Sequence, residues 1–230
     1  MVHRRVIVGL AVMLLTAAAN SAEQSEEAER VRLAATVFTE IMGAPDKAIP
    51  SAILRRAEAI AVFPGTLKGG FIFGAHRGRG IISVRGADTK EWSAPAFLTL
   101  TGGSFGLQVG GQSVDVVLVV MNRRGLEKLL QNEFKIGADA AAVAGPLGRD
   151  AEASTDLMLQ AEILSYSRTR GLFAGISLKG SSLRADRDAN QRFYGQRLET
   201  RAIVMDGRMG KPEDADAIAG WRSTLRQSGS

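Results

Sequence analysis

The hydrophobic residues between positions 26 and 42 recur every three or four positions, as they do on one face of a helix. The apolar residues of this face are Val31, Ala34, Ala35, Phe38, Ile41 and Met42. Gly43-Ala-Pro45 follows and is expected to end the helix. The opposite face carries Glu26, Glu27, Arg30 and Glu40, whereas a helix lying in a membrane surface is usually richer in Lys and Arg there. We therefore expect this helix to pack on the protein's own core.

The pattern after this helix is that of a β-rich chain with a few short helices. Strand patterns are found at residues 59–63, 71–73, 80–85, 97–101, 105–109, 114–121, 140–144, 162–168 and 171–179. Helical spacing is found at residues 50–56, 124–131, 187–194 and 213–227. Many of the 26 glycines lie inside the strand patterns, where glycine marks curvature or, alternatively, the close approach of a ligand. The sequence predicts an α+β fold, with a curved, mainly antiparallel sheet or partial barrel and flanking short helices.

Two basic segments are predicted to form hairpin tips. Residues 75–79 connect two strand patterns through a glycine, and a second basic turn separates residues 162–168 from residues 171–179. If both tips lie at one end of the sheet, their four arginines form a patch suited to phosphate, which a guanidinium binds with two hydrogen bonds. The residues predicted to contact lipid are Lys68, Arg77, Arg79, Arg168, Arg170 and Lys179. The alternative is that these residues are solubilising charges of exposed turns.

The N-terminus has the layout of a secretory signal peptide. Arg4 and Arg5 precede an apolar run from Val6 to Leu15, and small residues follow as far as Ala22. The apolar run is too short for a comfortable membrane span. We assign residues 1–22 to the signal peptide, residues 23–29 to an acidic linker, and residues 30–230 to a single domain that includes the C-terminal helix. The mature protein is expected to be periplasmic or secreted.

Charge and composition exclude several classes of function. The chain of 230 residues has a net charge of +5, but residues 1–22 contain Arg4, Arg5 and no acid, so 27 basic and 24 acidic residues remain and leave +3. Nucleic acid is a poor partner for so small a charge without interleaved aromatic residues. The chain has no cysteine and only two histidines, so neither a disulfide nor a thiolate or multi-histidine metal site is expected. No cofactor is predicted.

The sequence offers little support for catalysis. Gly102-Gly-Ser104-Phe-Gly106 fits the GxSxG pattern of a serine nucleophile, but a strand pattern continues after it and no histidine follows residue 76. His76 has no adjacent carboxylate, so it is interpreted as a solvated hairpin residue and not as a general base. Carboxylates such as Asp115, Asp139 and Glu162 are expected to serve as caps, turns or ion pairs. We therefore predict that the protein is not an enzyme.

A series of short segments resembles the SYLF domain family. The segments are Ala59-Ile-Ala-Val-Phe-Pro64, Lys68-Gly-Gly70, Trp92-Ser-Ala-Pro95, Gly102 to Gly110, Lys135-Ile-Gly-Ala-Asp139, Gly145-Pro-Leu-Gly148, Ser165-Tyr-Ser-Arg168, Gly171-Leu-Phe-Ala-Gly175 and Tyr194-Gly195. They occur in the order typical of the family and extend from about Arg30 to Gly195. The resemblance implies lipid binding, with eukaryotic relatives that recognise phosphoinositides and, in some cases, actin.

Together, these features predict an exported, non-enzymatic protein that contacts anionic phospholipid headgroups peripherally. A lipid or a membrane surface is the expected partner, and actin is not expected because the protein is predicted to be exported. One alternative is an envelope scaffold or protein-interaction module. Another is an unrecognised serine hydrolase that uses Ser104.

Overall fold

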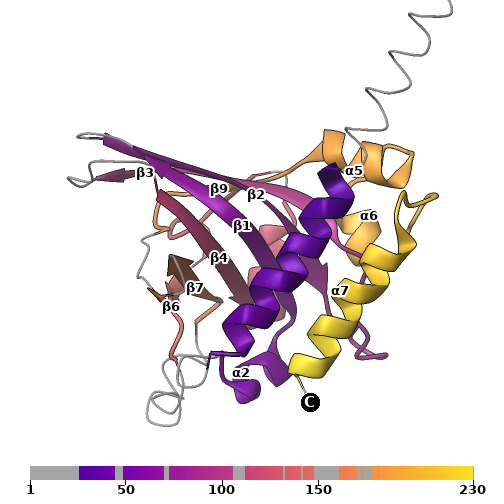
Figure 1. The fold of residues 1–230 in the computed structure, drawn as a ribbon, viewed down its shortest axis with the longest axis horizontal. Coiled ribbons are helices and arrows are strands. Elements are labelled where there is room, and N and C mark those ends of the chain that lie inside the picture. The colour runs from indigo at the N-terminus through magenta and orange to yellow at the C-terminus, as the bar shows by residue number, and fades with distance from the viewer. Residues whose placement is uncertain are drawn as a thin grey trace, which may run out of the picture.

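A strongly curled β-sheet forms the body of the molecule in the computed structural model (Figure 1). The structure describes residues 26–44, 49–69, 73–105, 112–131, 133–140, 142–147, 161–169, 172–173 and 178–229. The strands are β1 Ala59–Gly69, β2 Phe73–Val84, β3 Ala96–Phe105, β4 Gln112–Val120, β5 Glu133–Lys135, β6 Ala142–Ala144, β7 Ile163–Thr169, β8 Leu172–Phe173 and β9 Ser182–Ala185. Their order is β5-β9-β3-β2-β1-β4-β7-β6, and β8 pairs with β7.

The sheet is mainly antiparallel, as predicted. The pairs formed by β1, β2, β3, β4 and β9 with their neighbours are antiparallel, and the pairing of β6 with β7 is parallel. The helices are α2 Ser51–Arg56, α3 Arg123–Leu129, α5 Arg187–Tyr194, α6 Thr200–Val204, α7 Ala215–Ser228 and a helix over residues 26–42, called the N-terminal helix below. The curved α+β fold expected from the sequence is therefore confirmed.

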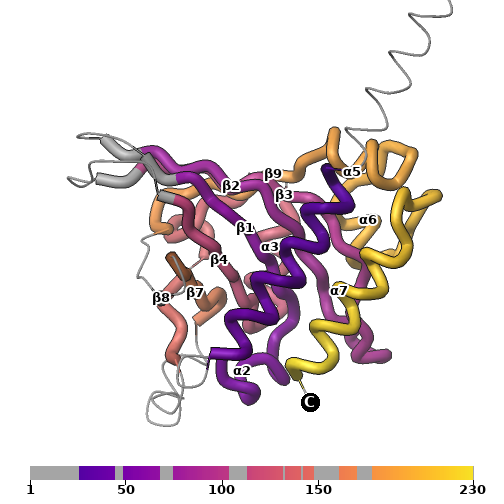
Figure 2. The backbone as a smooth tube through the Cα atoms, viewed as in Figure 1, coloured from indigo at the N-terminus to yellow at the C-terminus, as the bar shows by residue number. Residues whose placement is uncertain are grey.

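The N-terminal helix and α7 lie side by side across one face of the sheet (Figures 1 and 2). Phe38 contacts Trp221 of α7 edge to face, with 5.9 Å between ring centroids. The Trp221 indole Nε1 in turn donates a hydrogen bond of 2.9 Å to Ser83 Oγ of β2. The two helices are thus joined to each other and to the sheet, and we call the side of the sheet that they cover the helix face.

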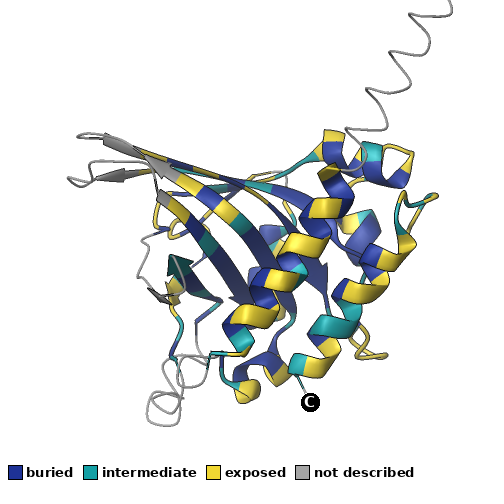
Figure 3. Cartoon of the chain, viewed as in Figure 1, coloured by how far each residue is buried: buried dark blue, intermediate teal, exposed yellow. Residues whose placement is uncertain are grey.

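The N-terminal helix packs on the core in the way its apolar spacing predicts. Val31, Ala34, Phe38 and Ile41 are all fully buried. Figure 3 shows the same pattern along both helices, with buried positions toward the sheet and exposed positions away from it. Residues 26–29, which the sequence assigned to an acidic linker, are helical, and Glu27 is fully buried among them.

Glycines let the strands accept bulky neighbours on the opposite face of the sheet, which we call the inner face. A Cβ at Gly80 would lie 2.5 Å from the Phe63 ring, and a Cβ at Gly102 would lie 2.6 Å from the His76 ring. Real Cβ atoms do not approach ring atoms so closely, so the absence of a side chain is required at both positions. These glycines serve packing within a curved sheet, which is the first of the two readings offered by the sequence.

The first predicted hairpin tip is wrong. Residues 75–79 lie within a single strand, β2, and pair with residues 99–103 of β3. Glycine ended the predicted strands too early, because Gly78 and Gly80 accommodate the side chains of Thr66 and Phe63 across the sheet instead of forming a turn. β1 likewise continues past Pro64 as far as Gly69, through an irregular pairing between Val62 and Leu67.

Other differences concern short elements. The sequence patterns missed β5, β9 and α6, which are three to five residues long and too short for a clear period. The predicted strand at residues 105–109 is described only at Phe105, where β3 ends, and of the strand at residues 171–179 only β8 is described as a strand. Within the part of the chain that the structure describes, no helix combines the length and apolar character needed to cross a bilayer.

Candidate functional site

A groove of about 350 Å³ lies between the N-terminal helix and strands β1 and β2. The helix contributes Leu33 together with charged residues, and β1 contributes Pro64, Gly65 and Leu67. β2 contributes Arg77 and Arg79. The groove therefore combines apolar side chains with arginines, and two of the residues predicted to contact lipid lie in it.

The alternation of β2 places these arginines on the helix face. Arg77 and Arg79 are exposed, whereas the residues between and beside them, His76, Gly78 and Gly80, are buried. Successive side chains of a strand point to opposite faces, so the two arginines share one face. Leu67 pairs with Arg77 in the β1–β2 ladder, so these two side chains lie next to each other on that face.

The turn in β1 that brings Leu67 beside Arg77 has a specific backbone requirement. Gly65 has a φ of +56°, in the left-handed region that favours glycine. Its N–H donates a hydrogen bond of 2.9 Å to Asp115 Oδ1 on β4. The Pro64-Gly65 irregularity is therefore fixed by a neighbouring strand, and it shapes one wall of the groove.

The apolar side chains of the groove are unusually exposed. Leu67 is 67% exposed and Leu33 is 46% exposed. Leu33 lies outside the apolar spacing that docks the helix on the core, and Leu67 follows the Pro-Gly irregularity. Both are absent from the residues predicted from the sequence, although an isolated leucine on the polar side of an amphipathic helix is a signal that could have identified Leu33.

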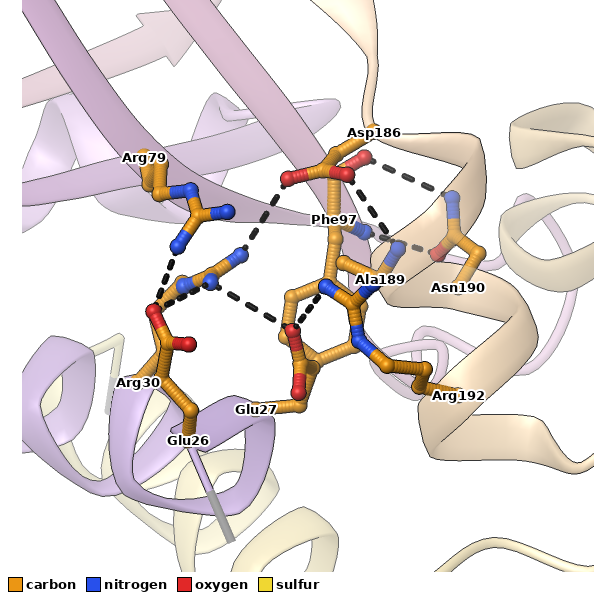
Figure 4. A network of polar contacts seen from close by, with 9 residues as sticks. All are labelled: Glu26, Glu27, Arg30, Arg79, Phe97, Asp186, Ala189, Asn190 and Arg192. Atoms are coloured by element: carbon orange, nitrogen blue, oxygen red, sulfur yellow. Dashed lines mark hydrogen bonds and ion pairs between the residues drawn. The ribbon is translucent and has the colours of Figure 1, made fainter. Parts of the chain in front are cut away.

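A cluster of ionic contacts borders the groove (Figure 4). Arg79 forms an ion pair with Glu26, and Arg30 lies 3.5 Å from Glu26 Oε1 and 3.5 Å from Glu27 Oε1. Three further contacts complete the cluster. Arg30 lies 3.4 Å from Asp186, and Arg192 lies 2.9 Å from Glu27. The Ala189 N–H donates a hydrogen bond of 3.2 Å to Asp186 Oδ1. The cluster links the N-terminal helix to β2 and to the start of α5.

Burial separates the members of this cluster into two groups. Glu27 is fully buried and Arg30 is 6% exposed, whereas the side chains of Glu26 and Arg79 are 52% and 44% exposed. Burial lowers the pKa of the Arg30 guanidinium, and the nearby charge of Arg79 lowers it further. The buried contacts of Glu27 and Arg30 therefore hold the N-terminal helix on the sheet, whereas the exposed pair, Glu26 and Arg79, faces solvent at the groove.

The structure does not bring Arg168 together with Arg77 and Arg79. Strands β1 and β4 separate β7 from β2, and Arg168 forms ion pairs with Glu40 of the N-terminal helix and, at 3.2 Å, with Asp115. Burial alone would lower the pKa of Arg168, but its hydrogen bonds with these two carboxylates outweigh that cost and raise it. Arg168 therefore holds the far end of the helix.

The remaining predicted residues are placed differently. Lys68 is part of β1, where it pairs with His76 and with Gln112 of β4. Lys179 is exposed in the turn before β9, and β3 separates β9 from β2. Arg170 lies outside the described residues. Of the four arginines of the predicted patch, Arg77 and Arg79 line the groove, and Arg168 lies elsewhere on the sheet.

The structure also places His76 and the backbone of Ser104, the two residues considered for catalysis. The prediction that His76 is solvated is wrong: it is 3% exposed, and its Nε2 lies 2.9 Å from Ser181 Oγ. Ser104 pairs with Gly74 inside the β2–β3 ladder, so it is not at the strand-to-helix turn that exposes a hydrolase nucleophile. Asp115, Asp139 and Glu162 serve in ion pairs or turns, as expected.

Among the described residues, no group of three His, Cys, Asp or Glu side chains is placed so that it could hold a metal ion. The ionic cluster beside the groove instead alternates acids with arginines, so its carboxylates already have cationic partners. The chemistry available at the groove is the recognition of an anion next to an apolar group.

Comparisons with known proteins identify the family of the chain. The family model named Ysc84, described as "Las17-binding protein actin regulator", matches residues 101–224. The chain is 32% identical over 198 residues to Protein YSC84 of Saccharomyces cerevisiae, covering 85% of this chain and 42% of that protein. It is 34% identical over 195 residues to SH3 domain-containing YSC84-like protein 1 of Rattus norvegicus, covering 84% of this chain and 56% of the relative.

A third relative is LAS seventeen-binding protein 3 of Saccharomyces cerevisiae, which is 31% identical over 198 residues, covering 85% of this chain and 42% of that protein. The chain thus spans about half the length of the curated relatives it matches. The family model spans the end of β3, then β4, β9 and most of the C-terminal helices, and it therefore includes the SYLF-like segments from Gly102 to Gly195. The chain belongs to the Ysc84 (SYLF) family.

Proposed function

We propose that the protein binds anionic phospholipid headgroups peripherally, at the groove beside the N-terminal helix, and that it catalyses no reaction. The observation that carries this proposal is the position of the exposed Arg77 next to the exposed Leu67. A guanidinium can hold a headgroup phosphate through two parallel hydrogen bonds. Leucine side chains beside it can enter the apolar boundary of the same bilayer. The groove therefore offers arginines to the headgroup phosphate and leucines to the apolar part of the phospholipid.

The magnitudes favour reversible, peripheral binding. A basic residue near an anionic membrane surface contributes about 1 kcal/mol, and burying a leucine contributes about 1.5–3 kcal/mol. Two arginines and two partly inserted leucines thus give a moderate affinity that depends on salt. An anionic lipid is expected to bind more tightly than a neutral one, and high salt should weaken the difference.

Export is part of the proposal. The basic start, the apolar run from Val6 to Leu15 and the small residues up to Ala22 favour removal of residues 1–22 and a periplasmic or secreted mature protein. The mass of the protein recovered from an expressing bacterial cell tests this step. Cleavage near residue 22 is expected, and an intact N-terminus on the cytoplasmic side would contradict it.

Vesicle flotation tests the lipid proposal. The mature protein is expected to float with phosphatidylcholine vesicles that contain phosphatidylglycerol, and not with vesicles of phosphatidylcholine alone. The double variant Arg77→Ala/Arg79→Ala should lose affinity by roughly 30-fold, since two charges near the surface, each contributing about 1 kcal/mol, are removed. Arg123→Ala/Arg124→Ala on α3 is the matched control, because it removes two adjacent exposed arginines remote from the groove.

Two outcomes would overturn the proposal. Wild-type protein that floats with neither vesicle type does not bind these lipids, and equal losses in the two double variants would mean that only overall charge matters. Inorganic phosphate at matched ionic strength forms a further arm of the experiment. Weak competition is expected if the lipid surface is recognised, whereas complete competition would identify free phosphate as the ligand of the groove.

A protein partner is the second candidate function, favoured by the family description, which names Las17 binding and actin regulation. Actin filaments are the available test. Co-sedimentation of wild-type protein with filaments, undiminished in the Arg77→Ala/Arg79→Ala variant, would support a separate protein-binding surface. Absence of co-sedimentation together with vesicle binding would favour the lipid proposal alone.

A further inference from the structure

We infer that Glu26 is a built-in competitor for the anionic ligand of the groove, because it occupies Arg79 in the free protein. This inference rests on the proposed function and concerns the regulation of the same site. Its basis is that one residue, Arg79, both lines the groove and forms an ion pair with a carboxylate of the N-terminal helix. A headgroup phosphate must therefore displace Glu26 before Arg79 can bind it fully.

The position of Glu26 makes it an effective competitor. Its Oε1 contacts Arg79 and also lies 3.5 Å from Arg30, so the carboxylate sits between two cations at the groove (Figure 4). A phosphate that approaches Arg79 meets a negative charge at the same guanidinium. Arg77, by contrast, has no ion-pair partner among the described residues and is exposed. The ligand is expected to reach Arg77 first and Arg79 only after exchange.

Glu26 can leave without undocking the helix. Its ion pair with Arg79 is exposed on both sides, and pairs of this kind are weak. The helix remains attached through the fully buried Glu27, which contacts Arg30 and Arg192, and through its buried apolar residues. Exchange of Glu26 for a phosphate is therefore a local rearrangement of one side chain, and it sets the affinity of the groove.

Glu29 provides a matched control for this inference. It lines the same groove and carries the same charge, but its carboxylate lies 3.8 Å from Arg32, which also pairs with Asp214, the N-cap residue of α7. Replacement of either glutamate by glutamine removes one negative charge from the groove. Only replacement of Glu26 also frees Arg79. The difference between the two variants isolates the competition from general electrostatics.

The experiment measures binding to phosphatidylcholine vesicles that contain phosphatidylglycerol, at one salt concentration, for Glu26→Gln and Glu29→Gln with Arg79 present or replaced by alanine. Both glutamine variants should bind roughly fivefold more tightly than wild type, because a negative charge near the membrane is lost. Glu26→Gln should gain a further two- to fivefold from the release of Arg79. In the Arg79→Ala background, the two glutamine variants should bind alike.

The outcomes separate this inference from the proposed function. Equal affinity of Glu26→Gln and Glu29→Gln, with Arg79 present, overturns the competition even when lipid binding and its dependence on Arg77 stand. If Glu26→Gln still binds vesicles more tightly than Glu29→Gln in the Arg79→Ala background, the competition is overturned as well, since Arg79 is then not the residue released. Failure of wild type and all variants to bind overturns both proposals. Circular dichroism of each variant verifies that the helix content is unchanged.

Discussion

Alternate residues of β2 lie in two different environments. Arg77 and Arg79 face the groove, whereas Gly78 and Gly80 face the side chains of Thr66 and Phe63 on the inner face. Packing requires glycine at these inner-face positions, whereas both arginines are exposed on the helix face, where Arg79 forms an ion pair with Glu26. The local geometry of the groove therefore depends on residues that never reach its surface.

Substitution of Gly80 by alanine tests this dependence. The added Cβ would meet the Val62 carbonyl and lie 2.5 Å from the Phe63 ring, and backbone cannot move away easily. We expect a loss of about 1–3 kcal/mol in the free energy of unfolding, measured by urea denaturation. Gly220→Ala in α7 is the control: nothing lies within 4 Å of its Cβ position, and the helix should gain about 0.5–1 kcal/mol. Equal effects of the two substitutions would contradict this account.

Arg168 shows what sequence can and cannot predict about a single residue. Its basic turn beside β7 and β8 was predicted from the local pattern, and that hairpin pairing is confirmed. Its partners, Glu40 and Asp115, are 128 and 53 positions away in the chain. Because charge pairing between distant segments leaves no local pattern, the sequence could not distinguish a ligand contact from an arginine that holds a helix.

The N-terminal helix is attached to the sheet by ionic contacts toward both of its ends as well as by its apolar face. Glu26 and Glu27 contact arginines of β2 and α5, and Glu40 contacts Arg168 of β7. The acidic side chains that made this segment a poor membrane helix are thus explained by partners within the protein. Two of the arginines predicted to bind lipid, Arg79 and Arg168, pair with this helix.

Glu27 is predicted to be the most important of these carboxylates for stability. Glu27→Ala would leave Arg30, which is nearly buried, and Arg192 without the carboxylate they share. We expect a loss of about 3 kcal/mol in the free energy of unfolding, the low end for breaking a buried ion pair, because Arg30 would lose its fully buried carboxylate while its contacts with Glu26 and Asp186 remain. Glu29→Ala, at an exposed position of the same helix, should change it by less than about 0.5 kcal/mol. Thermal or urea denaturation would show a similar loss in both variants if the buried contacts were unimportant.

The helices were more predictable than the strands. The three- and four-residue spacing at residues 26–42 and 187–194 matches the helices of the structure, because one face of each is buried. β2 was divided in two because glycine within a strand resembles a turn signal. From residue 76 to residue 80, arginine nevertheless alternates with histidine or glycine, and such two-residue alternation indicates a strand. Interpreted in this way, the segment places Arg77 and Arg79 on one face of the sheet.

On the scale of the whole molecule, helices from opposite ends of the described chain close a single core. Trp221 of α7 is fully buried against Phe38 and donates to Ser83. Segments nearly two hundred residues apart therefore depend on each other, and this relationship could not be read from local sequence patterns. The order of the segments that resemble the SYLF family was informative here, because it indicated the fold without requiring these contacts to be known.

A shared core predicts cooperative unfolding. Trp92 and Trp221 are both buried, and they report on the connection between β2 and β3 near α2 and on the junction of the two long helices. Unfolding in urea followed by tryptophan fluorescence and by far-ultraviolet circular dichroism should give coincident transitions. An early loss of helical signal, before the fluorescence changes, would mean that the helices detach from a sheet that remains folded.

The alternation along β2 has a consequence for folding itself. If β2 paired with its neighbours one residue out of step, every side chain of the strand would change sides, and Arg77 and Arg79 would point toward Thr66 and Phe63. Burying two guanidinium groups without partners would cost several kcal/mol, so the mispaired sheet is strongly disfavoured. The charges offered to a ligand thus also select one way of assembling the strands. Neutral residues at positions 77 and 79 would remove this penalty against the shifted register, even in a variant whose native state is as stable as that of the wild type.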